Sequence, residues 1–172
     1  MRLMAETLKI NLAERSYAIH IAADLGTEVR HEVTQRTTPG RRVAVLTDTN
    51  FDQAQSAALR AMVGETPMLI VEPGEGSKSL DGLGRVLDFL AEHKIDRGGA
   101  LFAVGGGVIG DLGGFAAASW LRGIDFFQVP TTLLAMVDSS VGGKTGINLA
   151  AGKNLAGAFH QPRGVFISTH LL

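Results

Sequence analysis

The chain has 172 residues, of which 45% are apolar and 19% are charged, a composition typical of one well-packed globular domain. Its formal net charge of −1 offers no electrostatic basis for binding nucleic acid or an anionic membrane surface. It has no cysteine, which excludes disulfides and thiolate metal sites. It also shows no signal-peptide core and no window of the roughly 20 apolar residues that cross a bilayer. We therefore expect a cytoplasmic protein without nucleic-acid or membrane partners.

In chain order, the apolar pattern predicts strands that alternate with helices. Alternation of apolar and polar residues over 8–12 and 17–21 predicts a hairpin or an edge pair of strands. Further strands are expected at 42–47, 68–71, 100–104, 126–129 and 165–169, and helices at 25–37, from the cap residues 48–50 to 62, at 77–93, at 105–120 and from 131 into 138. Almost wholly apolar strands between helices favour an α/β fold with a Rossmann-like, mostly parallel sheet and helices on both faces. The strand order cannot be inferred from the sequence.

A glycine motif follows the strand at 100–104. Gly105, Gly107 and Gly110 satisfy G-x-G-x-x-G between a strand and a helix, where backbone amides can approach a pyrophosphate. The motif lies late in the domain and lacks the acidic residue expected about 20 residues later, so an ordinary Rossmann fingerprint does not fit. A phosphate loop of a different kind is the functional interpretation, and a tightly packed, glycine-rich helix entry is the structural alternative.

The segment 141–146, with Lys144 near its end, superficially matches a phosphate-binding P-loop. The position that should hold the first glycine is Asp138, whose charge would repel the phosphates. We therefore reject an ATPase, and Lys144 remains a candidate ligand for a phosphate or a hydroxyl.

Two acids stand at the ends of neighbouring strands. Asp48 follows the strand at 42–47, and Glu75 lies in the turn after the strand at 68–71. Each is explained by helix capping when taken singly, whereas the two together suit the hydroxyls of a ribose. They would also disfavour a 2′-phosphate, which favours NAD over NADP.

A fourth polar cluster contains Lys153, Asn154, His160 and Gln161 in what looks like a glycine-containing loop. A solvated loop explains it as well as a binding site does. No two histidines have metal-ligand spacing, so no metal site is expected in this chain.

Four of these segments, taken in order, resemble the dehydroquinate synthase family of sugar-phosphate cyclases. The matching blocks are PGEGSKS at 73–79, GGGVIGDLGGFAAASWLRGI at 105–124, VPTTLLAMVDSSVGGKTGIN at 129–148 and GKNLAGAFHQP at 152–162. The resemblance implies that residues 1–172 correspond to the N-terminal α/β NAD-binding domain of that family.

The resemblance also implies roles for individual residues. Those that would contact the ribose, pyrophosphate or nicotinamide of NAD are Asp48, Glu75, Lys78, Gly107, Val108, Ile109, Gly110, Asp111, Thr131, Thr132, Lys144 and Lys153. Those implied to act in catalysis on the substrate are Asp138, Lys144, Asn154 and Arg122. Arg122 would reach the substrate phosphate across the interface of a homodimer, a task that suits a planar guanidinium.

The family reaction converts the seven-carbon sugar acid phosphate DAHP to 3-dehydroquinate and phosphate, in the shikimate pathway of aromatic amino-acid biosynthesis. It proceeds through transient oxidation by NAD, phosphate elimination, reduction and an intramolecular aldol closure. The resemblance implies a divalent metal as well, zinc or cobalt, whose Glu and two His ligands lie in a C-terminal helical domain that would follow Leu172. We therefore expect this chain alone to be inactive, with apolar surface exposed or used for self-association.

Three other interpretations stay open. Another NAD-dependent sugar-phosphate cyclase shares the domain, although the block at 152–162 favours the dehydroquinate branch. Metal-dependent polyol dehydrogenases share the architecture, but the block around 138–148 argues against them. A catalytically dead NAD-binding or interaction module is the third.

Overall fold

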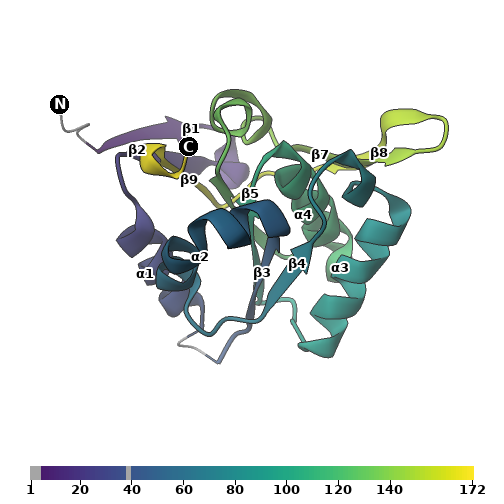
Figure 1. Ribbon diagram of the computed structural model, residues 1–172, viewed down its shortest axis with the longest axis horizontal. Coiled ribbons are helices and arrows are strands. Elements are labelled where there is room, and N and C mark those ends of the chain that lie inside the picture. Colours follow the sequence, from purple (N-terminus) through teal and green to yellow (C-terminus); the bar gives the residue numbers. More distant parts are fainter. Residues whose placement is uncertain (1–4, 38–39) are drawn as a thin grey trace.

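The computed structural model describes residues 5–37 and 40–172, and a seven-stranded sheet forms its centre (Figure 1). The strands are β1 (Glu6–Ile10), β2 (Tyr17–Ala22), β3 (Val43–Asp48), β4 (Met68–Val71), β5 (Ala100–Gly105), β6 (Asp125–Pro130) and β9 (Gly164–Ser168). Their order is β1-β2-β9-β6-β5-β3-β4. β1 pairs antiparallel with β2, and the other pairs in this sheet are parallel. The predicted parallel α/β sheet and its antiparallel edge are confirmed.

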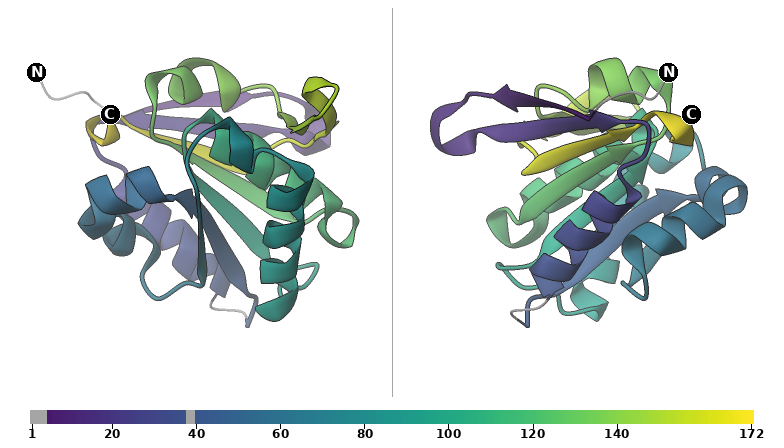
Figure 2. Two further views of the ribbon diagram at one scale, coloured as in Figure 1. Left: turned by 45° about the vertical axis from the view of Figure 1, so that its right-hand side comes forward. Right: turned by 90° about the vertical axis from the view of Figure 1, so that its left-hand side faces the viewer.

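Helices cover both faces of the sheet, as Figures 1 and 2 show. α1 (Gly26–Thr37) and α2 (Thr49–Val63) pack on one face, and α3 (Leu80–Glu92) and α4 (Gly107–Ser119) pack on the other. The two cores follow from the strand repeat, because successive side chains point to opposite faces. Val43 and Val45 belong to the α1/α2 core, whereas Ala44 and Leu46 belong to the α3/α4 core.

Short helical turns join these elements. They are η1 (Ala13–Arg15), η2 (Glu75–Ser77), η3 (Trp120–Arg122), the π-helical turn η4 (Ala135–Ser139) and η5 (Thr169–Leu171). The helix expected at 77–93 begins later, because η2 comes first and the Ser79 hydroxyl then caps α3 by accepting a hydrogen bond from the Gly82 amide at 3.2 Å. Met136 of η4 packs against Tyr17 and Val165, which places this turn over β2 and β9.

The prediction of a polar loop around Lys153 to Gln161 is wrong in one respect, since most of this segment is a strand. β7 (Lys144–Leu149) and β8 (Gly152–Phe159) form an antiparallel hairpin that extends beyond α3 in Figure 1. The glycines of this segment are the reason that the sequence did not predict a strand. Gly146 lies opposite Gly157, and a Cβ on Gly157 would lie 2.1 Å from the Thr145 carbonyl oxygen. Such close backbone approach requires glycine, and glycine in a strand otherwise suggests a loop.

Helix α4 approaches its neighbours closely through two more glycines. A Cβ on Gly113 would lie 3.1 Å from Cβ of Ala103 in β5. A Cβ on Gly114 would lie 2.3 Å from Cγ2 of Thr145 in the hairpin and 3.0 Å from the Phe126 ring. The absence of side chains at these positions lets α4 touch the sheet and the hairpin together.

This packing predicts opposite effects for two glycine-to-alanine changes. Gly114→Ala should lower the free energy of unfolding by about 1–3 kcal/mol, because the added methyl overpacks the contact with Thr145. Gly84→Ala, on α3 with no atom within 4 Å of its Cβ position, should raise it by about 0.5–1 kcal/mol through helix propensity. Urea unfolding measures both, and an unchanged or more stable Gly114→Ala variant would contradict the packing argument.

Candidate functional site

A cavity of about 500 Å³ opens at the carboxyl ends of the parallel strands, the usual ligand edge of such sheets. We call it the strand-end cavity. Several segments contribute its walls, because parallel strands end at the same edge. Its lining includes six of the predicted cofactor residues: Asp48 at the end of β3, Gly107, Val108 and Ile109 after β5, and Thr131 and Thr132 after β6.

The glycine loop in this cavity fits both interpretations of its sequence, tight packing at the helix entry and a phosphate-binding loop. Gly105 and Gly110 serve packing, since a Cβ there would lie 2.7 Å from Ile109 Cγ1 and from Gln128 Oε1 respectively. Gly106 and Gly107 line the cavity at the start of α4. First-turn amides have no acceptor within a helix and carry partial positive charge, so this end suits a phosphate.

Asp48 has a structural role as well as a place in the cavity. It is the N-cap of α2, and its Oδ1 accepts a hydrogen bond from the Phe51 amide at 3.0 Å. The capping interpretation is therefore confirmed. The side chain also lines the strand-end cavity, so a contact with a ribose stays a prediction.

A buried ion pair joins the segment after η2 to helix α4. The Lys78 ammonium, with 5% of its side chain exposed, donates a hydrogen bond to Asp111 on α4. Burial raises the pKa of the Asp111 carboxyl, and the hydrogen bond from Lys78 opposes that rise. In the structure the Lys78 ammonium thus contacts Asp111, and its expected contact with a ribose stays a prediction.

A second cavity of about 590 Å³, which we call the hairpin cavity, lies between α4, η4 and the β7–β8 hairpin. Asp111, Asp138, Lys144 and Asn154 all line it, so three of the four predicted catalytic residues come together. Asp138 lies in a π-helical turn, a feature often found at functional sites. The rejection of a P-loop also stands, because Lys144 begins a strand and not a helix.

Five predicted residues do not line either cavity: Glu75, Lys78, Gly110, Lys153 and Arg122. Lys153 is an exposed residue of β8 beside Asn154 and is not among the residues that line the hairpin cavity. Arg122 is exposed in η3, where Leu121 and Arg122 both have positive φ, 50° and 70°. Non-glycine residues in this conformation are strained and often functional. The structure therefore holds Arg122 away from the cavities of its own chain.

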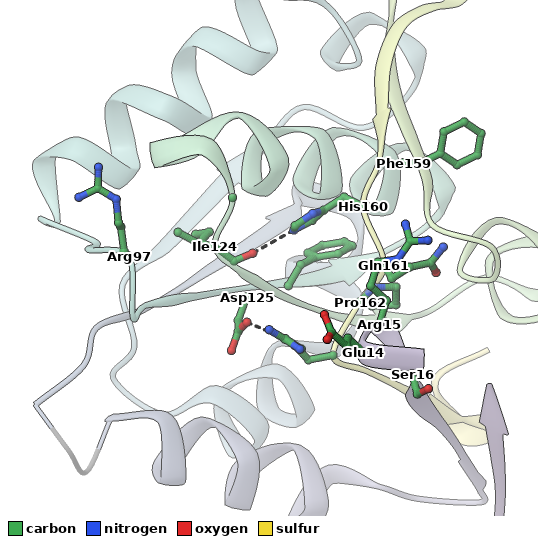
Figure 3. Close-up of a pocket in the computed structure, with 13 residues that line it drawn as sticks. Glu14, Arg15, Ser16, Arg97, Ile124, Asp125, Phe159, His160, Gln161 and Pro162 are labelled. Atoms are coloured by element: carbon green, nitrogen blue, oxygen red, sulfur yellow. Dashed lines mark hydrogen bonds and ion pairs between the residues drawn. The ribbon is translucent and has the colours of Figure 1, made fainter. Parts of the chain in front are cut away.

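A third cavity, of about 430 Å³, lies near the amino end of β6 and contains much of the motif at 159–162 (Figure 3). His160 Nε2 donates to the Ile124 carbonyl at 2.9 Å, which ties the end of β8 to the segment after Arg122. Gln161 donates to the Gly142 carbonyl at 3.1 Å. Both side chains therefore support the backbone beside Arg122 and Lys144.

The sequence did not indicate a role for Asn148, which lies near the hairpin cavity. Asn148 donates to Glu75 and accepts a bond from Asn154, so it joins residues from two predicted groups. Its place at the end of the block 129–148 was the available signal, but spacing alone gave it no role.

Within 5–37 and 40–172, no three His, Cys, Asp or Glu side chains are grouped so that they could hold a metal ion. No helix in these ranges is long and apolar enough to span a bilayer.

Comparison with known proteins shows the family and the fold of the chain. The family described as 3-dehydroquinate synthase N-terminal matches residues 68–172. A 3-dehydroquinate synthase of Opitutus terrae is 64% identical over 98% of this chain, and that of Prochlorococcus marinus is 42% identical over 96%. The chain spans about half the length of these relatives, 47% and 46%.

A solved structure is also similar along most of the chain. It is 2-deoxy-scyllo-inosose synthase in complex with carbaglucose-6-phosphate, NAD+ and Co2+, with 29% identity and a TM-score of 0.84. The alignment covers 97% of this chain and 46% of that one.

The ion pair between Lys78 and Asp111 predicts a pH-dependent stability effect. Lys78→Met should cost about 3 kcal/mol at neutral pH, the lower end for breaking a buried pair, because Asp111 keeps 21% of its side chain exposed. Without Lys78 the pKa of Asp111 rises further. A raised pKa means that this group's stability contribution is present at acid pH and is lost as pH rises, so the cost should shrink towards about pH 4.

Urea unfolding at both pH values tests this effect. The double variant Lys78→Met/Asp111→Asn should recover most of the loss, because no buried charge remains unpaired. Arg163→Met is the control: its pair with Asp125 is 2.7 Å long but half-exposed, and Asp125 keeps Arg36. The control should cost under about 1 kcal/mol. A Lys78→Met variant no less stable than this control would contradict the prediction.

Proposed function

Because the chain belongs to the 3-dehydroquinate synthase family, we propose that it is the NAD-binding part of an enzyme that converts DAHP to 3-dehydroquinate and phosphate. The observation that carries the proposal is the pair of cavities around α4. One gathers six predicted cofactor residues, and the other gathers Asp138, Lys144 and Asn154. Helix α4 contributes residues to both cavities, so the cofactor and the substrate would both bind next to this helix.

The residues of the strand-end cavity fit a dinucleotide. Gly106 and Gly107 leave room for phosphates at the helix start, where the amides would donate to them. The Asp48 carboxylate would accept hydrogen bonds from a ribose, and Thr131 and Thr132 line the same cavity. NAD, when bound, supplies hydride acceptance and return. A related cyclase structure holds NAD+, which supports this assignment.

The residues of the hairpin cavity suit a sugar acid phosphate. The Lys144 ammonium would bind an anionic or hydroxyl group, and the Asn154 amide would both donate to and accept from the sugar. The Asp138 carboxylate would accept a hydrogen bond from a hydroxyl group of the sugar and so orient that hydroxyl. Arg122 would serve the phosphate of a partner's site in a homodimer, in keeping with its strained turn outside both cavities.

We also propose that residues 1–172 form one α/β domain and that a second, helical part holds the divalent metal, zinc or cobalt. The twofold length of the relatives supports this division. Apolar side chains beside the cavities support it too: Leu134, Val137 and Phe159 are 67%, 69% and 74% exposed. A metal would polarise the hydroxyl to be oxidised. The absence of cysteine accords with a cytoplasmic setting.

A second candidate is a cyclase for a different sugar phosphate, since one such enzyme shares this fold at 29% identity. The 64% identity to a 3-dehydroquinate synthase favours DAHP.

Calorimetric titration tests the cofactor assignment. The chain should bind NAD, and NADP more weakly, because Asp48 disfavours a 2′-phosphate. Asp48→Asn keeps a good helix cap but loses the charge, so it should weaken NAD binding about tenfold and narrow the preference over NADP while leaving stability nearly unchanged. Asp48→Ala should in addition lose about 1 kcal/mol of stability. Wild-type NAD affinity in Asp48→Asn would refute the ribose assignment.

An activity assay tests the division into two parts. The chain with DAHP, NAD and zinc should form no dehydroquinate, whereas a fusion to the second half of the Opitutus terrae relative should form it. In that fusion, Lys144→Met should lower kcat/KM on the order of 100-fold through loss of a charged contact. Lys9→Met, an exposed lysine of β1, is the matched control and should have no effect. Equal activity of the two variants would remove Lys144 from the site.

A further inference from the structure

Asn148 occupies an irregular position in the hairpin. The ladder pairs Ile147 with Ala156 and then Leu149 with Gly152, so the register shifts at Asn148. Bulges of this kind redirect side chains and occur beside active sites. Asn148 is half-buried and faces the turn η2 from the hairpin.

Three hydrogen bonds connect Asn148 to the segment 75–78 and to Asn154 of β8. Its main-chain amide donates to the Lys78 carbonyl at 2.8 Å. Its side-chain Nδ2 donates to Glu75 Oε2 at 2.6 Å, and its Oδ1 accepts from the Asn154 amide at 2.9 Å. A carboxylate can only accept and an amide N–H can only donate, so these partners determine the orientation of the Asn148 side chain.

The hydrogen bond to Asn154 is made at a residue with a left-handed backbone conformation. Asn154 has φ of 56°, in the left-handed region that non-glycine residues seldom adopt. Its side chain lines the hairpin cavity. The Asn148 Oδ1 therefore accepts a hydrogen bond from the amide of Asn154, whose left-handed backbone conformation directs its own side chain to the hairpin cavity.

We propose that Asn148 is a positioning residue that holds Asn154 at the substrate cavity and Glu75 at the cofactor side simultaneously. The inference rests on the proposed function, in which Glu75 contacts NAD and Asn154 contacts substrate. Only a short amide provides one acceptor and one donor at this place: aspartate keeps the acceptor and loses the donor, and alanine loses both.

Two measurements on the 172-residue chain test the inference. Amide hydrogen exchange, read by NMR, reports the Asn154 bond, and calorimetry with NAD reports Glu75. In Asn148→Ala, exchange at Asn154 should rise about tenfold and NAD affinity should fall by a similar factor. In Asn148→Asp, protection of the Asn154 amide should be retained, while NAD binding weakens because Glu75 loses its donor and faces a second carboxylate. Asn11→Asp, an exposed residue outside the site, controls for the added charge and should change neither.

Each outcome separates this inference from the proposed function. If the wild type binds NAD and both Asn148 variants bind it equally well, the positioning of Glu75 is overturned and NAD binding stands. Unchanged exchange of the Asn154 amide in Asn148→Ala overturns the hairpin part. If the wild type does not bind NAD, the proposed function fails and the cofactor part of this inference fails with it, whereas the exchange result still decides the role of Asn148 in the hairpin.

Discussion

Helix α4 lies against the sheet, helix α3 and the hairpin together, and the rest of the site depends on that contact. Gly113 and Gly114 remove the side chains that would hold it away from Ala103 and Thr145. A helix bound this closely cannot shift without opening a void, since protein interiors are close-packed. Its amino end is thereby held at the strand-end cavity, and its next turn carries Asp111 to the hairpin cavity.

An ion pair and hydrogen bonds then join the segment 75–78, α4 and the hairpin. Lys78 and Asp111 form a pair from which water is largely excluded, and Asn148 connects the same turn to the hairpin through the Lys78 carbonyl and Glu75. A buried pair stabilises little by itself, but losing one partner is costly. The pair therefore specifies one arrangement of η2, α4 and the hairpin. In the proposed function, such connected elements would keep cofactor and substrate groups at a constant separation, as hydride transfer requires.

The strained and exposed features lie around this rigid centre. Arg122 stands in a left-handed turn, and Val137 and Phe159 are exposed beside the hairpin and η4. The relatives that this chain matches are about twice its length. In the proposed function, the described domain provides one wall of a larger site.

The sequence by itself determined the alternation of strands and helices, the parallel sheet and the capping by Asp48, because these depend on local periodicity and on neighbours a few residues apart. It also indicated residues of both cavities, those of the strand-end cavity because strand ends meet at one edge and those of the hairpin cavity through the family resemblance of the segments 129–148 and 152–162. The hairpin was missed because Gly146 and Gly157 suggest a loop, and their need for glycine appears only when the two strands are paired. Strand order, the partner of Lys78 and the three contacts of Asn148 were decided by tertiary structure alone. Each joins residues distant in the chain, and no local preference specifies which distant segments will meet.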